Sequence, residues 1–228
     1  MNYLNKIFKC YNAYCLLLDK RIEFWSELHG SFIQKGIGLQ RFLVGDGGLN
    51  EHYSHVDSGS LPDYYNGSTN YGTWYKSPAP LNAWLSHRKI IEKSLLEGFD
   101  HVLIIEDDVF IEDDFDEVLW KAEPFFIENK WDAVYFGGYH NENSWRLTNN
   151  DNVIKLQGSG GWHGVLLSRP IMEELMQELP IGPYDWIMGQ KYHQKYDCYA
   201  IYPSVISQKS GHSYVENSNL DKPSRYKR

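Results

Sequence analysis

The feature that most constrains this chain is a short apolar run that ends in three acids. Residues 102–105 (VLII) are flanked by charged or polar residues, and Glu106, Asp107 and Asp108 follow them directly. An unbroken apolar run of this length is typical of a strand that is covered on both faces. Such strands belong to α/β proteins, in which helices lie on both sides of a mostly parallel sheet. We therefore predict an α/β fold that places these acids at the carboxyl end of a buried strand.

Apolar runs alternate with helical patterns along the chain. Strands are expected at 13–19, 39–45, 101–107, 131–138 and 161–168. Helices are expected at 21–35, 80–99, 113–127, 170–178 and 185–194. The helix at 80–99 has the clearest ends, because Pro80 suits a first turn and Gly98 suits a C-terminal stop. The alternation predicts a single Rossmann-like domain over residues 1–228, with its ligand beyond the carboxyl ends of the strands.

The acidity of the chain is local. It carries 22 Lys and Arg against 30 Asp and Glu, and eight of these acids lie within residues 106–117. Outside that stretch the two signs balance at 22 each. A neutral remainder disfavours nucleic acid as a partner, because binding along a phosphate backbone needs an excess of basic residues. The dense carboxylates instead favour a cation.

Neither a membrane span nor a secretory signal is expected. No apolar run approaches the roughly 20 residues of a membrane helix, and the first 21 residues lack a long apolar core followed by a cleavage site. The three cysteines, Cys10, Cys15 and Cys198, are an odd set without CxxC spacing, which argues against a disulfide framework and a structural zinc site. We expect a cytoplasmic protein with reduced thiols.

Three adjacent carboxylates after a buried strand need a counter-charge. On an extended chain Glu106 and Asp108 point to one side and Asp107 to the other. Mg²⁺ and Mn²⁺ prefer oxygen ligands, and substrate phosphates often complete the shell of Mg²⁺. The acids further along the chain suit the N-terminal turn of the next helix: Glu112, Asp113, Asp114 and Asp116. Residues 106–108 are therefore predicted to bind a metal or a nucleotide.

Residues 83–109 (AWLSHRKIIEKSLLEGFDHVLIIEDDV) resemble the central signature of the family-25 glycosyltransferases, which include bacterial lipooligosaccharide galactosyltransferases and collagen galactosyltransferase domains. The match joins LSH on a helix, an acidic-Gly-aromatic spacer and an apolar strand closed by EDDV. Residues 15–21 (CLLLDKR), 132–138 (DAVYFGG) and 203–213 (PSVISQKSGHS) resemble the family's first strand, a following strand and its terminal segment. The resemblance implies a GT-A fold.

The resemblance also implies a set of binding residues. In a GT-A fold an acidic motif holds Mn²⁺, or Mg²⁺, against the two phosphates of a nucleotide sugar. The implied metal ligands are Glu106, Asp108 and His212, although His212 suits a surface loop equally well. The residues implied for the UDP-sugar donor are Leu18, Asp19, Arg21, Ser86, His87, Asp107, Gly161 and Trp162. For His87 the alternative is a buried histidine that the backbone satisfies.

Sugar transfer to a hydroxyl also needs a general base. Asp185, in GPYDWIMGQ, is our candidate. The alternative is a helix cap, because Asp is among the best capping residues. Asp151 and Glu142 are the next candidates for the base. Glycines in 158–164 (GSGGWHG) would allow the backbone to approach a ligand closely.

Together these features predict a metal-dependent, inverting glycosyltransferase that moves a hexose, galactose or glucose, from a UDP-sugar to a carbohydrate or a hydroxylated side chain. Residues 46–80, rich in Gly, Pro and aromatic residues, are then expected to form an acceptor-side lid, and 216–228 a polar tail. Two alternatives stay open. A Mg²⁺-dependent phosphohydrolase or phosphotransferase would need an Asp-x-Asp start, whereas the triplet at 106–108 begins with Glu. A non-catalytic carbohydrate-binding protein would suit the 15% aromatic content.

Overall fold

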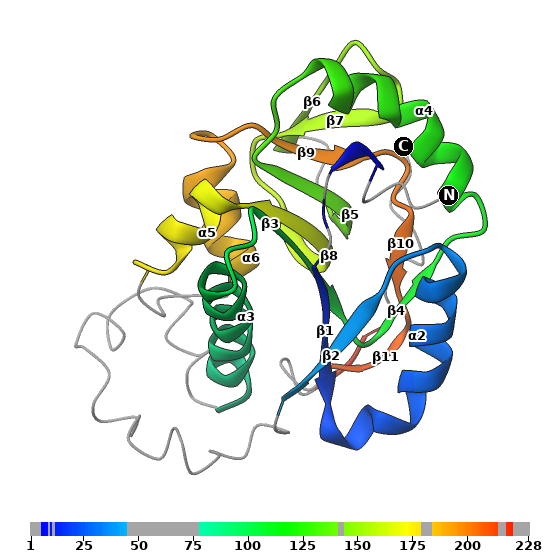
Figure 1. The fold of residues 1–228 in the computed structure, drawn as a ribbon, viewed down its shortest axis with the longest axis vertical. Coiled ribbons are helices and arrows are strands. Elements are labelled where there is room, and N and C mark those ends of the chain that lie inside the picture. The colour runs from blue at the N-terminus through cyan, green and yellow to red at the C-terminus, as the bar shows by residue number, and fades with distance from the viewer. Residues whose placement is uncertain are drawn as a thin grey trace.

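The computed structural model describes residues 6–8, 10, 12–44, 78–140, 144–178, 184–213 and 218–220. An eight-stranded sheet with the order β2-β1-β3-β8-β5-β9-β7-β6 forms the centre of this part of the chain (Figure 1). Its strands are β1 (Ala13–Leu18), β2 (Leu39–Val44), β3 (His101–Glu106), β5 (Ala133–Tyr139), β6 (Trp145–Leu147), β7 (Val153–Leu156), β8 (Gly160–Ser168) and β9 (Cys198–Ile201). The protein is therefore of the α/β class, as predicted.

The sheet is mixed, and the expectation of a mostly parallel sheet is wrong. The pairs β1/β2, β1/β3 and β5/β9 are parallel. The pairs β3/β8, β5/β8, β7/β9 and β6/β7 are antiparallel. Strand β8 inserts between β3 and β5 and runs opposite to both. Because an apolar run reports burial on both faces and not direction, its sequence looked like that of a parallel strand.

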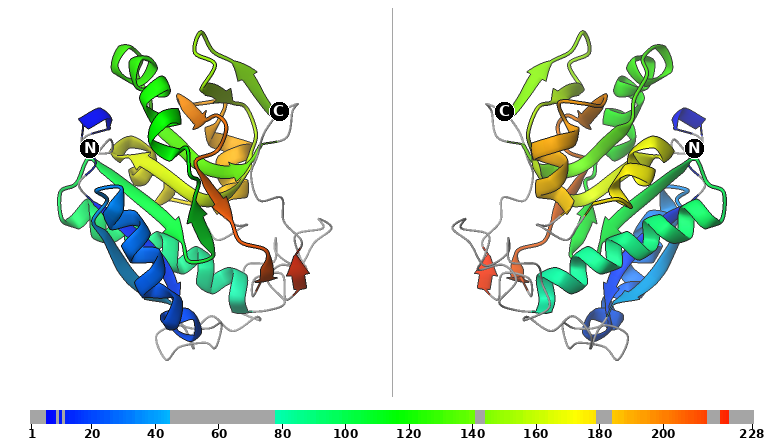
Figure 2. Two further views of the ribbon diagram at one scale, coloured as in Figure 1. Left: turned by 90° about the vertical axis from the view of Figure 1, so that its right-hand side faces the viewer. Right: turned by 90° about the vertical axis from the view of Figure 1, so that its left-hand side faces the viewer.

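Helices cover both faces of the sheet (Figures 1 and 2). One face carries α2 (Trp25–Gln34) and α4 (Phe115–Glu128), and the other carries α3 (Pro78–Leu96), α5 (Arg169–Leu175) and α6 (Tyr184–Ile187). All five predicted helices are confirmed in place. The first begins as a 3₁₀ turn over Asp19–Phe24, and the last continues as a π turn over Met188–Tyr192. None of the described helices combines the length and apolar character that a bilayer crossing requires.

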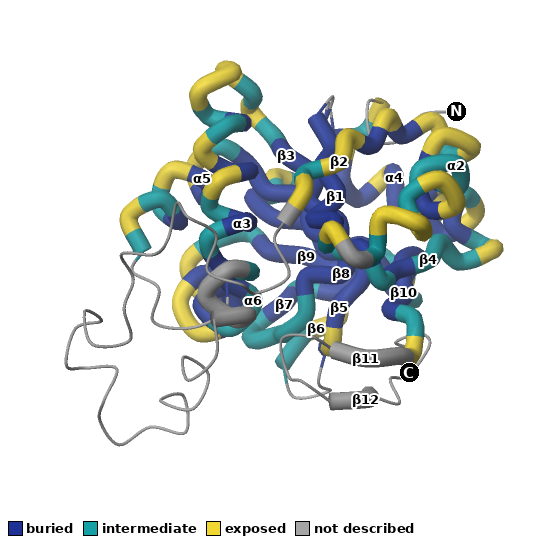
Figure 3. Tube along the Cα trace, turned by 90° about the horizontal axis from the view of Figure 1, so that it is seen from below, coloured by how far each residue is buried: buried dark blue, intermediate teal, exposed yellow. Residues whose placement is uncertain are grey.

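Strand β3 shows how the two cores are built. Leu103 and Ile105 belong to the core beneath α2 and α4, whereas Val102 and Ile104 belong to the core beneath α3 and α5. All four side chains are at most 1% exposed. This division follows from the period of two along a strand. Figure 3 shows the buried strands at the centre and exposed residues concentrated on the surrounding helices.

Two short ribbons complete the described structure. Strand β4 (Val109–Ile111) pairs with β10 (Ile206–Gln208), and β11 (Gly211–Ser213) pairs with β12 (Ser218–Leu220). The first ribbon brings the C-terminal part of the chain beside the acids that follow β3. Of the lid expected at 46–80, residues 46–77 lie outside the described part and 78–80 begin α3. Of the tail expected at 216–228, only 218–220 are described, as β12.

The three cysteines are buried and free, as their spacing predicted. Burial raises the pKa of the Cys10 thiol to about 11, and it raises the pKa values of Cys15 and Cys198 further. A thiol whose pKa is raised in this way carries little thiolate and is a poor nucleophile. The cysteines therefore contribute to packing and not to a reactive site.

Strand β10 crosses β5 at Gly137, and this close crossing can be tested. A Cβ atom on Gly137 would collide with the backbone carbonyl of Ile206. We expect Gly137→Ala to lower the free energy of unfolding by about 3 kcal/mol, because backbone must move to make room. Gly30 in α2 is the control, since a Cβ there meets nothing within 4 Å. Gly30→Ala should stabilise by about 0.5–1 kcal/mol. Urea unfolding measures both, and similar effects would contradict the crossing.

Candidate functional site

Four segments of the chain meet at one edge of the sheet. Strands β1, β3 and β5 end there at Leu18, Glu106 and Tyr139. Strand β8 runs the other way and begins there, with Gly160 paired to Tyr139. Ligands of α/β proteins bind at the edge where parallel strands present their carboxyl ends. The structure thus places the acidic triplet at the predicted edge.

Asp107 joins the ends of β1 and β3. Its side chain is buried, with Oδ2 accepting a hydrogen bond from the Leu18 backbone N–H at 2.8 Å and Oδ1 accepting one from Arg21 Nη1 at 2.5 Å. Burial raises the pKa of Asp107 to about 6, although Arg21 and the Leu18 N–H both oppose the rise. Both oxygens are engaged within the chain. Asp107 therefore joins the two strand ends, and the donor contacts expected for Asp107 and Leu18 stay predictions.

Asp108 lies in the turn between β3 and β4 and has one oxygen to spare. Its Oδ2 accepts a hydrogen bond from Gln208 Nε2 at 2.9 Å and lies 3.6 Å from Arg21 Nη1. Its Oδ1 is buried and has no hydrogen-bond partner in the structure. Burial, reinforced by the neighbouring Glu106 carboxylate, raises the pKa of Asp108. A buried oxygen in this state is costly unless a cation or a donor reaches it, so Asp108 fits a metal ligand.

Glu106 is held by a buried histidine from β8. His163 Nδ1 donates to Glu106 Oε2 at 3.0 Å, and the imidazole is 4% exposed. The other ring nitrogen, Nε2, is buried without a hydrogen-bond partner in the structure. The ring also stands edge-on to Tyr139, with 4.8 Å between the centroids. His163 therefore fixes the direction of the Glu106 carboxylate.

Gln208 and Tyr139 are site residues that the sequence did not reveal. The Tyr139 hydroxyl donates to Gln208 Oε1 at 2.6 Å, and the Gln208 amide in turn donates to Asp108. This chain of bonds ties β5 and β10 to the acidic turn. The available signal was the likeness of 203–213 to the terminal segment of the family, which indicated the segment but not the residue.

Asp185 lies in the first turn of α6 and fastens the glycine segment of β8. Its Oδ2 accepts from the Gly161 N–H at 2.8 Å and its Oδ1 from the Trp186 N–H at 2.9 Å. Gly161 has φ +79°, a backbone conformation that favours glycine. Burial raises the pKa of Asp185, the direction that a general base requires. The carboxylate therefore accepts two backbone N–H bonds and has the raised proton affinity that a base requires.

His87 has one ring nitrogen fixed by the backbone and one without a partner. Its Nδ1 lies 2.8 Å from the Ala83 carbonyl, so Nδ1 donates and Nε2 holds the lone pair. Nε2 is buried and makes no hydrogen bond in the structure. Burial lowers the pKa of His87, and the Glu106 and Asp185 carboxylates only partly offset this effect. A neutral acceptor cannot attract phosphate by charge, but it can accept a hydrogen bond from a hydroxyl. The backbone therefore provides a hydrogen-bond partner for Nδ1 but not for Nε2.

Trp162 lies in the core, so its expected contact with the donor stays a prediction that its side chain does not support. It is 1% exposed and stacks on Tyr184, with 5.5 Å between the centroids and 12° between the planes. Its Nε1 donates to the Tyr135 hydroxyl at 3.3 Å. Its edge supports the His87 ring at a centroid distance of 5.1 Å. Trp162 therefore packs against the His87 ring and restricts its orientation.

The remaining predicted residues divide into three groups. Ser86 is buried in α3 beside His87, and Asp19 is exposed in the 3₁₀ turn after β1. His212 pairs through its backbone with Asn219 in the ribbon of β11 and β12, and its side chain lies outside the described structure. Asp151 is exposed in the turn between β6 and β7, and Glu142 lies outside the described residues. The structure thus gathers Arg21, the acidic triplet, His87, Gly161 and Asp185 at one edge.

The carboxylates at this edge fit a hard divalent cation only where a substrate adds further ligands. Among the described residues, no group of three or more His, Cys, Asp or Glu side chains is placed to hold a metal ion. Mg²⁺ needs only one or two protein carboxylates when substrate phosphates supply further oxygens. Glu106, oriented by His163, and Asp108, with its unpartnered oxygen, offer such a pair.

Comparisons with known proteins give no family. No family model matches the sequence, and no curated protein matches it. Among solved structures, the crystal structure of A197 from STIV aligns with 95% of this chain and 98% of its own, at 14% identity and a TM-score of 0.43. A likeness at this level does not extend to residues or activity.

The Arg21–Asp107 pair should be a large source of stability. We expect Arg21→Met to lower the free energy of unfolding by about 3 kcal/mol, because it leaves the buried Asp107 carboxylate without its counter-charge. Asp107→Asn added to that variant should restore part of the loss. Lys121→Met, which breaks the exposed pair with Glu117, should cost less than about 1 kcal/mol. Urea unfolding with a chelator present measures all three, and no recovery in the double variant would contradict the joint.

Proposed function

We propose that the protein is a metal-dependent, inverting glycosyltransferase of the GT-A type. It would transfer a hexose, galactose or glucose, from a UDP-sugar to a hydroxyl of a carbohydrate or of a hydroxylated side chain. The observation that carries this proposal is the buried, unpartnered Oδ1 of Asp108 beside Glu106, at the carboxyl end of β3. The resemblance of residues 83–109 to the family-25 glycosyltransferases supports the choice of donor.

Glu106 and Asp108 would hold Mn²⁺ or Mg²⁺, with His212 as the proposed third ligand. When bound, the cation supplies positive charge that stabilises the departing nucleoside diphosphate. The chain supplies the orientation. His163 fixes Glu106 through Nδ1–H, and Gln208 fixes Asp108 through its amide. Arg21 places a second positive charge between Asp107 and Asp108, which limits repulsion within the triplet.

Asp185 is the proposed base for a single displacement. Its two hydrogen bonds, from Gly161 and Trp186, hold the carboxylate in one orientation. Its raised pKa favours removal of a proton from an acceptor hydroxyl. Direct attack by that hydroxyl on the anomeric carbon inverts its configuration, which is why the proposed reaction is inverting.

His87 gives the proposed donor site a hydroxyl acceptor. Its neutral ring holds a lone pair on Nε2 near Glu106 and Asp185. A ribose or hexose hydroxyl of the donor carries the proton that this nitrogen lacks. The expected contact of His87 with the donor is therefore proposed for a hydroxyl and not for a phosphate.

Replacement of Asp108 tests the metal assignment. We expect Asp108→Asn to weaken Mn²⁺-dependent UDP binding at least 100-fold, because the amide keeps the shape of the side chain but loses its charge. Without metal the variant should be slightly more stable than the native chain. Asp113→Asn is the matched control, since it removes an exposed acid from the same run. Calorimetric titration of UDP with Mn²⁺ measures the affinities, and unchanged binding in Asp108→Asn would reject the assignment.

Replacement of Asp185 separates the base from the cap. If Asp185 is the base, Asp185→Asn should lower kcat at least 10²-fold with donor affinity nearly preserved. Asn can still accept one of the two N–H bonds, so the melting temperature should change little. Asp151→Asn, in an exposed turn, is the control. Donor turnover is the readout, beginning with hydrolysis of UDP-hexoses and of simple phosphate esters. Native turnover in Asp185→Asn would place the base elsewhere, and ester hydrolysis alone would favour a phosphohydrolase.

A further inference from the structure

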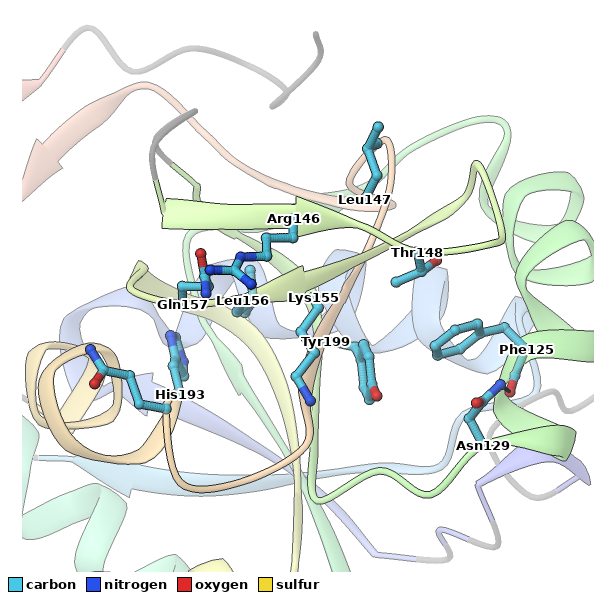
Figure 4. Close-up of a pocket in the computed structure, with 11 residues that line it drawn as sticks. Phe125, Asn129, Arg146, Leu147, Thr148, Lys155, Leu156, Gln157, His193 and Tyr199 are labelled. Atoms are coloured by element: carbon cyan, nitrogen blue, oxygen red, sulfur yellow. Dashed lines mark hydrogen bonds between the residues drawn. The ribbon is translucent and has the colours of Figure 1, made fainter.

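A cavity of about 770 Å³ lies toward the β6 side of the sheet, away from the acidic edge. Strands β6, β7 and β9, the end of α4 and the π turn after α6 surround it (Figure 4). Its volume is within the range of small-molecule sites in proteins. It shares no lining residue with the site described above.

The lining carries positive charge without acids. Arg146 from β6 and Lys155 from β7 both line the cavity, and no Asp or Glu does. Lys155 is paired with Asp197 at 2.5 Å, whereas the described structure gives the Arg146 guanidinium no ion pair. The chain as a whole has a net charge of −8, so this cavity differs from the rest of the molecule. A guanidinium without an ion pair beside the cavity favours binding of an anion there.

A buried histidine lies in the same lining. Trp162 Nε1–H donates to the Tyr135 hydroxyl, which is hydrogen-bonded to His193 Nε2 at 2.9 Å. When the hydroxyl donates to Nε2, the proton of the neutral imidazole lies on Nδ1. His193 is 2% exposed, and its Nδ1 has no hydrogen-bond partner in the structure. The ring directs this N–H away from Tyr135.

The other end of the cavity is aromatic. Phe125 and Tyr199 pack edge to face there, with centroids 5.0 Å apart, and the Lys155 ammonium lies 5.2 Å from the centre of the Tyr199 ring. Figure 4 shows Arg146 and His193 toward one end, Phe125 toward the other, and Lys155 and Tyr199 between them. Donors at one end and apolar rings at the other suit a molecule with an anionic group on a compact ring.

We propose that this cavity is a second small-molecule site, which binds an oxyanion, phosphate or carboxylate, carried on a ring the size of a sugar. The oxyanion would contact the Arg146 guanidinium, with His193 in the cavity wall beside it. The ring would lie along Tyr199 toward Phe125. This proposal does not depend on the transferase function.

The ligand class can be tested on the full chain by calorimetric titration with glucose 6-phosphate, glucuronate and glucose. At least one charged sugar should bind saturably, and glucose should bind at least tenfold more weakly. The preferred charged sugar tells phosphate from carboxylate. Added salt should weaken the binding, because Arg146 is exposed. Equal binding of glucose, or no saturable binding of either charged sugar, would overturn the proposal.

Three variants locate the binding. Arg146→Gln should weaken the charged sugar at least tenfold, whereas Lys121→Gln removes the same charge from the exposed face of α4 and should not. His193→Phe should also weaken binding, with its melting curve checked because the residue is buried. Asp108→Asn should leave the affinity unchanged. Native affinity in Arg146→Gln would overturn the site, and a loss in Asp108→Asn would move the ligand to the acidic edge.

Discussion

The buried bond system of Asp107 is the constraint on which the site depends. One carboxylate binds the last N–H of β1 and the guanidinium of Arg21, so the ends of two parallel strands are fixed to each other. Held in this way, the turn after β3 points Glu106 toward His163 and Asp108 toward Gln208. Arg21 also lies 3.6 Å from Asp108, so a single guanidinium offsets the charge of two acids. Asp107 takes the Leu18 N–H and the close contact with Arg21, and Asp108 Oδ1 is left without a hydrogen-bond partner.

Local patterns in the sequence predicted most of the elements but not their directions. The run at 102–105 and the run within β8 are both apolar, both buried and both bounded by polar residues. One is parallel to β1 and the other is antiparallel to β3. Side-chain burial is the same in the two cases, so only the connections along the chain decide the direction. The short strands β6, β7 and β9 were missed because three or four residues carry too little periodicity to distinguish them from a loop.

The sequence predicted the site residues that directly follow strand ends, but not those that reach the site from distant parts of the chain. The acids and Arg21 follow strand ends directly, so their place at the sheet edge could be read from the sequence. Gln208 reaches Asp108 from 100 residues further along the chain, and nothing in its own surroundings marks it. Trp162 and His163 are neighbours, and the glycines before them indicated a ligand. Alternation along β8 sends the tryptophan into the core and the histidine to Glu106, which the sequence alone did not decide.

Two buried, neutral histidines lie between the acidic edge and the cavity. They place polar ring nitrogens in the core without adding a charge. Burial lowers the pKa of His87, and it lowers that of His193 to about 4. Trp162 packs against the first ring and reaches the second through the Tyr135 hydroxyl. His87 keeps a lone pair on Nε2 near Glu106 and Asp185, and His193 lies in the wall of the cavity. One buried tryptophan therefore connects a residue of the acidic edge with a residue of the cavity wall.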